Sequence, residues 1–163
     1  MRRSIEVMAN LTVMTCGIWA ISMFIQYRHA AVNNSQGTLV PGREILIQGV
    51  NFKNSQKTLV IALQQGCQFC AASMEFYKRL TEQAKQNRNA RIIAVFPNKV
   101  SEAKLYLQER GLGVSDIRQV SLSALNVSGT PTLILVNREG IAERIWVGQL
   151  AGSEESQVVT ALL

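Results

Sequence analysis

The sequence has few of the side chains that hold metal ions, since its 163 residues include only three cysteines and one histidine. Cys67 and Cys70 are separated by two residues, whereas Cys16 and His29 lie far from them, near the N-terminus. A zinc site usually needs four ligands. A metal site within one chain would therefore need carboxylates or a second chain to complete it, and we predict none.

The sequence also lacks a run of basic residues interleaved with aromatic ones. Its formal net charge is +6, but the 17 Lys and Arg residues are spread along the chain, as on an ordinary solvated surface. We therefore expect no nucleic-acid partner. Internal repeats and low-complexity tracts are absent, so a length of 163 residues indicates one ordinary domain and a small additional segment.

The additional segment is an apolar run at the N-terminus, where residues 7–25 contain no charged side chain. A helix of about 20 residues is long enough to span the hydrocarbon core of a bilayer. We therefore predict a membrane anchor at residues 1–26, with a transmembrane helix at about residues 7–25 in contact with the lipid bilayer. A polar linker at residues 27–38 would then lead to a domain at residues 39–163.

The alternative for this run is a signal peptide that is cleaved. Signal peptidase sites have small residues at positions −1 and −3. Cleavage after Ala30 would put Arg28 at position −3, and cleavage after Ala31 would put His29 there. Both sites are poor, and the run is longer than the core of a usual signal peptide, so we expect a retained anchor.

Cys67-Gln68-Phe69-Cys70 lies between an apolar run at residues 58–63 and a segment with helical spacing at residues 71–86. Two thiols at this spacing, where a strand turns into a helix, can close and open a disulfide. The N-terminus of a helix favours a thiolate, which is the nucleophile of disulfide exchange, so we predict Cys67 as the attacking group. A structural disulfide is the alternative, although so short a loop constrains the unfolded chain little.

Strands and helices are expected to alternate along the domain. The apolar runs predict strands at residues 44–47, 50–52, 58–63, 90–96, 132–136 and 141–147. The expected helices are residues 71–86, 101–111 and 153–163. Helical spacing after the cysteines predicts one buried face, made of Phe69, Ala72, Phe76, Leu80 and Ala84. The strand–helix–strand order implies parallel strands, and the last two strands form an antiparallel hairpin.

A further motif, Gly129-Thr130-Pro131-Thr132, opens the predicted hairpin. A Cys-x-x-Cys helix followed by this motif resembles the thioredoxin-like superfamily, over about residues 39–163. The early strands and the helix at residues 101–111 look like its membrane-anchored TlpA/ResA-type branch. The resemblance implies an α/β, thioredoxin-like fold, in which helices flank a central mixed sheet, and a cis peptide bond before Pro131.

The resemblance also implies a thiol–disulfide oxidoreductase that needs no cofactor. Cys67 would attack a disulfide in an exported protein, and Cys70 would then release the reduced protein by closing a disulfide with Cys67. The substrate groove would be lined by Gln68, Phe69, Thr130 and Pro131. By analogy, a membrane thiol–disulfide protein would be the electron donor. Because this chemistry belongs in an oxidising compartment, we expect the domain on the periplasmic side of a single-pass anchor.

The chain departs from thioredoxins at three places. Thioredoxins usually have Trp before the first cysteine and Gly-Pro between the two, and many have a buried Asp six residues before the first. Here those positions are occupied by Gly66, Gln68-Phe69 and Ile61. The direction of electron flow therefore stays open, and an oxidase or isomerase of the same fold is an alternative.

Two further alternatives belong to different functional classes. A peroxiredoxin-like peroxidase shares the fold but has Thr three residues before its reactive cysteine, where this chain has Gln64. A non-catalytic, anchored binding or chaperone module would use the groove, and the cysteines would be secondary. Mixed disulfides trapped through Cys67 would argue against the binding module, and peroxide consumption would argue for the peroxidase.

Overall fold

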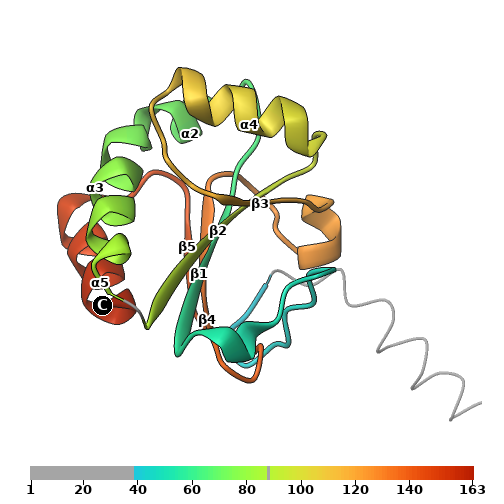
Figure 1. The fold of residues 1–163 in the computed structure, drawn as a ribbon, viewed down its shortest axis with the longest axis vertical. Helices are drawn as coiled ribbons and strands as arrows, with labels where there is room; N and C mark the ends of the chain where they lie inside the picture. The colour runs from blue at the N-terminus through green and yellow to red at the C-terminus, as the bar shows by residue number, and fades with distance from the viewer. Residues whose placement is uncertain (1–38, 88) are drawn as a thin grey trace, which may run out of the picture. The chain divides into compact units, whose positions relative to one another are not determined.

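The computed structural model describes residues 39–87 and 89–163, and Figure 1 shows these residues built around one sheet. The sheet is mixed, with five strands in the order β3-β2-β1-β4-β5. The first three strands are parallel, and β4 pairs antiparallel with both β1 and β5. The bounds are β1 (Lys57–Ala62), β2 (Ala90–Phe96), β3 (Asp116–Gln119), β4 (Thr132–Asn137) and β5 (Ala142–Val147).

Helical segments connect the strands and follow the last one. The α-helices of the described residues are α2 (Gln68–Ala72), α3 (Met74–Lys85), α4 (Val100–Glu109) and α5 (Gly152–Leu162). Two short 3-10 helices are η1 (Phe52–Asn54) and η2 (Leu122–Leu125). α3 and α5 lie side by side along the sheet (Figure 1). The predicted α/β fold, in which helices flank a central mixed sheet, is confirmed.

β1 forms the centre of the sheet because its apolar residues can be buried on both faces. Leu59 and Ile61 belong to one buried cluster, and Val60 and Ala62 belong to another. The first cluster also contains the buried residues of α3, α4 and α5. The second is completed by residues 39–52 and by the residues around η2. The residues that follow Ala62 therefore leave from the end of a strand that is packed on both sides.

The strand predicted at residues 44–47 is wrong. Ile45 and Ile47 are buried whereas Leu46 is exposed, which is the alternation that a half-buried strand would show. In the described residues, however, this segment forms one isolated bridge, between Glu44 and Ile141, and its backbone hydrogen bonds to residues 140–142 do not continue into a regular ladder. Burial of alternate side chains was therefore possible without a ladder of strand hydrogen bonds.

The strand predicted at residues 50–52 is wrong as well. Gly49 has a φ of +73°, so the chain turns immediately before this segment. The side chain of Asn51 then accepts a hydrogen bond from the N–H of Lys53 and caps η1. Phe52 lies in this helical turn, and its apolar side chain is buried there, as it would be in a strand.

The helix predicted at residues 71–86 is interrupted. α2 begins earlier, at Gln68, and the helix breaks at Ser73, which has a φ of −88° and a ψ of −1°. The hydroxyl and the N–H of Ser73 both donate to the carbonyl of Phe69, at 2.9 Å and 3.1 Å, and a hydroxyl contact of this kind bends helices. Phe76, Leu80 and Ala84 are buried as predicted, but Phe69 and Ala72, which precede the break, are exposed.

The predicted membrane segment is not part of the described fold. The anchor at residues 1–26 and the linker at residues 27–38 lie outside the described residues, and both stay predictions. Among the helices that the structure does describe, none combines the length and the apolar character needed to cross a bilayer.

Candidate redox site at Cys67 and Cys70

Cys67 and Cys70 are joined by a disulfide at the beginning of α2, and their Cα atoms are 5.2 Å apart. After β1, the chain turns through Gly66, which has a φ of +77°. Cys67 is the N-cap residue of α2, and its Sγ atom accepts a hydrogen bond from the N–H of Cys70 at 3.1 Å. Once the disulfide is reduced, this position favours the thiolate form of Cys67 because helix N–H groups face it.

The two sulfur atoms differ in their access to solvent. Cys67 is half-buried, whereas Cys70 is 0% exposed and belongs to the core cluster beneath α3. An incoming sulfur atom can therefore reach Cys67 directly, and it cannot reach Cys70 without movement of the helix. This difference matches the predicted roles of an attacking Cys67 and a resolving Cys70, which stay predictions.

The loop before β4 brings Thr130 and Pro131 to the cysteines, across 63 positions of sequence. The Sγ atom of Cys67 lies 3.3 Å from the carbonyl oxygen of Thr130, within reach of a thiol hydrogen bond. The Thr130–Pro131 peptide bond is cis, as the sequence resemblance implies. The carbonyl of Pro131 accepts a hydrogen bond from the N–H of Gly148 at 2.7 Å, which attaches this loop to the end of β5.

The predicted groove residues are presented in different ways. Gln68 and Phe69 are exposed on α2, and Phe69 is 56% exposed. Thr130 is half-buried next to Cys67, and Pro131 is buried. Thr130 therefore lies beside Cys67, and Phe69 is exposed to solvent. Pro131 is buried and affects the site through its backbone. Their role in substrate binding stays a prediction.

A buried acid near Cys70 is absent from the described residues. Ile61, at the position of the usual aspartate, is fully buried in the same cluster as Cys70. The buried polar residues of the described part are Thr58, Ser73, Thr81 and Thr132, and none of them carries a charge. The described residues also contain no group of three or more His, Cys, Asp or Glu side chains placed to hold a metal ion.

Glu75 is the first acidic residue after the cysteines, and it is held by a lysine instead of facing Cys70. Its carboxylate accepts a hydrogen bond from Nζ of Lys78 at 2.7 Å. This hydrogen bond and the lysine charge lower the pKa of Glu75. An exposed carboxylate with a lowered pKa is a weak proton acceptor, so Glu75 does not replace the missing buried acid.

Sequence reasoning missed the contribution of β5 to this site. Val147 is paired with Thr132 in the sheet, and its Cγ1 atom lies 4.0 Å from the position that a Cβ atom on Gly129 would occupy. The side chain of Val147 is 55% exposed. The signal that could have found it is topological, because the returning strand of a hairpin must end where the first strand begins.

The comparisons with solved structures support the fold. StoA from Bacillus subtilis is similar with a TM-score of 0.56 and 14% identity, covering 75% of this chain and 94% of that chain. The thioredoxin domain of a thiol-disulfide oxidoreductase from Bacteroides vulgatus has a TM-score of 0.56 and 18% identity, covering 78% and 99%. A thiol:disulfide interchange protein from a Bacteroides species has a TM-score of 0.53 and 19% identity, covering 77% and 89%.

No protein-family model and no curated protein matches the sequence. The similarity to solved structures is therefore a similarity of fold, at low sequence identity. Each of these neighbours is matched over at least 89% of its own length. The predicted thioredoxin-like fold of the described residues is confirmed.

Proposed function

We propose that this thioredoxin-like chain is a thiol–disulfide oxidoreductase that reduces disulfides in exported proteins through Cys67 and Cys70. One observation carries the proposal: a half-buried sulfur caps a helix beside the Thr130 carbonyl, and a second, buried sulfur follows three positions later. The names of two neighbours, a thiol-disulfide oxidoreductase and a thiol:disulfide interchange protein, support it.

The reaction transfers two electrons from the reduced Cys67–Cys70 dithiol to the substrate disulfide. The Cys67 thiolate attacks one sulfur of the substrate disulfide, so that a Cys67–substrate bond forms, the substrate S–S bond breaks, and the other substrate sulfur leaves as a thiolate. The Cys70 thiol then loses its proton and attacks Cys67. The Cys67–Cys70 bond forms, the Cys67–substrate bond breaks, and the second substrate sulfur leaves as a thiolate, so the substrate is released fully reduced.

The location of the chain is part of the same proposal. The apolar run at residues 7–25 would be a retained single-pass anchor, and the domain would face the periplasmic side, where exported proteins carry disulfides. A membrane thiol–disulfide protein would return electrons to the oxidised pair. The support for these points is the sequence pattern and the chemistry of the compartment.

The test is to trap the intermediate with a variant that lacks the resolving sulfur. Cys70→Ala is expected to accumulate mixed disulfides that run as adducts on a non-reducing gel and disappear with reductant. Cys67→Ala is the matched control, and it should trap nothing. Absence of adducts, together with a wild type that does not reduce insulin in the presence of dithiothreitol, would leave the binding module as the better explanation.

The direction of electron flow is tested by the reduction potential of the Cys67–Cys70 pair. A reductase should have a potential near that of thioredoxin, about −270 mV, whereas an oxidant should lie near about −120 mV. The measurement is the fraction of reduced protein in defined glutathione or dithiothreitol buffers. A value near about −120 mV would contradict the proposed direction of electron flow, but it would not contradict the thiol–disulfide chemistry.

A further inference from the structure

Cys67 is reached from β1 through a short turn, residues 64–66, whose side chains take no part in the exchange reaction. Before this turn, the N–H of Leu63 donates to the carbonyl of Val95 at 2.9 Å, beside the end of β2. The turn itself is closed by the N–H of Cys67, which donates to the carbonyl of Gln64 at 3.4 Å. A hydrogen bond of that length is weak, so the backbone of the turn does not by itself fix the position of Cys67.

One side chain of the turn reaches a different element. Nε2 of Gln65 donates a hydrogen bond to the carbonyl of Glu102 at 3.1 Å, across 37 positions of sequence. Glu102 lies in the first turn of α4, and α2 and α4 lie at the same end of the sheet (Figure 1). Gln64 and Gly66 are exposed, whereas Gln65 is half-buried. In the part of the chain that the structure describes, no other side-chain hydrogen bond joins residues 64–66 to another helix or strand.

The acceptor of this hydrogen bond is held in place by the packing of α4. The buried residues of α4 belong to the same core cluster as Cys70, and they are Ala103, Tyr106 and Leu107. A side chain packed in a core has little freedom to move, so the helix that carries it is fixed against the sheet. The hydrogen bond from Gln65 to the Glu102 carbonyl therefore attaches the turn before Cys67 to a fixed point.

The position of Cys67 matters because two neighbours act on its sulfur in opposite directions. The N–H of Cys70 donates to Sγ at 3.1 Å, and a donor at this place favours the thiolate. The carbonyl oxygen of Thr130 lies 3.3 Å from the same atom, and an acceptor at this place favours the protonated thiol. A small rotation of Cys67 changes the balance between the two contacts. The turn that sets this rotation therefore controls how much nucleophile is present.

We propose that Gln65 is a positioning residue for the attacking sulfur: its side-chain amide ties the turn to α4 and keeps Cys67 at the N-cap of α2. Gln65 acts through the backbone of the turn and not on the sulfur itself. Without the amide, the turn is free to move, and Cys67 loses part of its contact with the helix N–H groups. This inference rests on the proposed function, because it concerns the sulfur that begins the exchange.

The test removes the hydrogen-bond donor of Gln65 and keeps the length of its side chain. Gln65→Met places a thioether there, which cannot donate to the Glu102 carbonyl. Gln64→Met is the matched control, because it makes the same substitution at the neighbouring, exposed position. Both substitutions are made in the full chain together with Cys70→Ala. Cys67 is then the only thiol of the pair, and the backbone N–H of position 70 is still present.

The measurement is the rate at which iodoacetamide alkylates Cys67, followed by mass spectrometry from about pH 4 to about pH 9. The thiolate attacks the carbon of the reagent, an S–C bond forms and iodide leaves, so the rate follows the thiolate fraction. Gln65→Met should move the midpoint of this profile to higher pH. Below the midpoint its rate should fall about fivefold, less than the roughly tenfold expected for complete loss of a hydrogen bond to a charged group. Gln64→Met should stay within about twofold of the parent.

The outcomes separate this inference from the function on which it rests. At high pH, where the sulfur is ionised in every chain, the rates of Gln65→Met and Gln64→Met should converge. Rates that stay apart there would indicate a general disruption of the site and would overturn a positioning role. Equal pH profiles of the two variants would also overturn the inference, but they would leave the thiol–disulfide function intact. A wild type that reduces no insulin would overturn the proposed function, and this inference with it.

Discussion

At the carboxyl end of β1, the contacts around Cys67 are made by backbone groups and apolar side chains. At the amino end of the same parallel strands, charged side chains make the contacts. Thr130 and Gly148 exemplify the first group, through the Thr130 carbonyl beside Cys67 and the hydrogen bond from Gly148 to Pro131. Arg91 and Asp116 exemplify the second, as an ion pair between β2 and β3.

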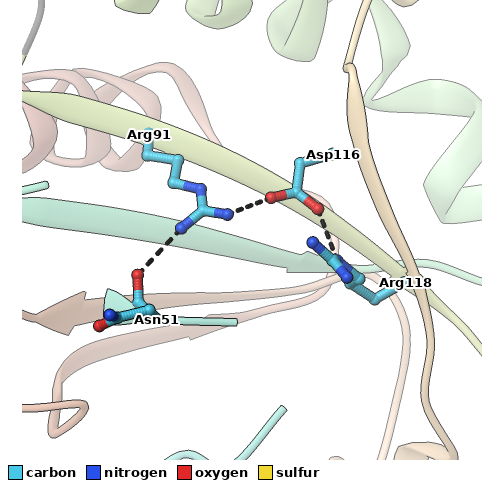
Figure 2. Close-up of polar contacts among 4 residues, drawn as sticks. All are labelled: Asn51, Arg91, Asp116 and Arg118. Atoms are coloured by element: carbon cyan, nitrogen blue, oxygen red, sulfur yellow. Dashed lines mark hydrogen bonds and ion pairs between the residues drawn. The ribbon is translucent and has the colours of Figure 1, made fainter. Parts of the chain in front are cut away.

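The charged end is a small network around one carboxylate (Figure 2). Asp116 accepts hydrogen bonds from the guanidinium groups of Arg91 and Arg118, and Nε of Arg118 lies 2.6 Å from it. Arg91 also donates to the carbonyl of Asn51 at 3.1 Å. Burial alone would raise the pKa of Asp116, but the hydrogen bonds from Arg118 and Arg91 and their charges lower it.

We expect the end with Cys67 to determine the chemistry and the end with Asp116 to contribute to stability. The network attaches β3, an edge strand of four residues, to β2 and to the segment before β1. The residues described around Cys67 are uncharged, so ion pairs do not fix the surroundings of its sulfur. Substitutions at one end should therefore change stability, and substitutions at the other should change reactivity.

The largest effect is expected at the dithiol end. Cys67→Ala should reduce disulfide reduction to the uncatalysed background, because the attacking sulfur is gone. Its stability should stay within about 1 kcal/mol of the reduced wild type, since neither protein then contains the disulfide, which contributes below about 2 kcal/mol for so short a loop. Insulin turbidity measures the first quantity and urea unfolding the second. A large loss of stability would remove the separation between the two ends.

The next effect is expected at the charged end. Asp116→Ala leaves two half-buried guanidinium groups without their carboxylate and should cost about 2 kcal/mol of unfolding free energy. The rate of insulin reduction should not change. Glu139→Ala removes an exposed carboxylate from the β4–β5 turn and serves as the control, with an expected change below about 0.5 kcal/mol.

The same carboxylate should make stability depend on pH in one direction. Because the pKa of Asp116 is lower in the folded chain than its ordinary value of 3.8, the unfolded chain binds the proton more tightly. The stabilisation is then fully present above about pH 4 and is lost as the pH falls through the lower, folded value. The difference in unfolding free energy between wild type and Asp116→Asn, followed from neutral to acidic pH, should shrink in that window.

The smallest effect concerns the core that lies between the two ends. The hydroxyl of Tyr77 is buried and makes no hydrogen bond of good geometry among the described residues, since the nearby Ser73 hydroxyl donates to Phe69. Burial raises the pKa of Tyr77 to about 12, and the Ser73 hydroxyl opposes this only in part. Tyr77→Phe keeps the ring and removes the unpaired group, so it should leave stability unchanged or raise it by up to about 1 kcal/mol. A loss of more than about 1 kcal/mol of unfolding free energy would indicate that the hydroxyl has a hydrogen-bond partner.

Much of the sheet was predictable because its strands are apolar and clearly bounded. Residues 90–96 were predicted as a strand and form β2 with the same limits, since the run ends at Pro97. β3 was not predicted, because Asp116 and Arg118 make half of its sequence charged. The ion pair between Arg91 of β2 and Asp116 helps to explain why so polar a segment joins the sheet.

The site was partly predictable for a similar reason. The spacing of Cys67 and Cys70 identifies the thiol pair, and the family resemblance adds Thr130. Val147 could not be found in this way, because its place beside Gly129 depends on strand register and not on any local pattern. Helical spacing likewise does not reveal the interruption at Ser73, whose hydroxyl donates to the Phe69 carbonyl.

The attachment of α5 has a practical consequence for handling the protein. Nζ of Lys57 donates to the carbonyl of Ala161 at 2.7 Å, and the side chain of Asn87 donates to the carbonyl of Leu163 at 3.1 Å. Lys57 begins β1, whereas Cys67 follows its other end, about 20 Å away for a strand of this length. A sensor surface or electrode linked through residues added after Leu163 would therefore hold the molecule with its reactive sulfur facing the solution.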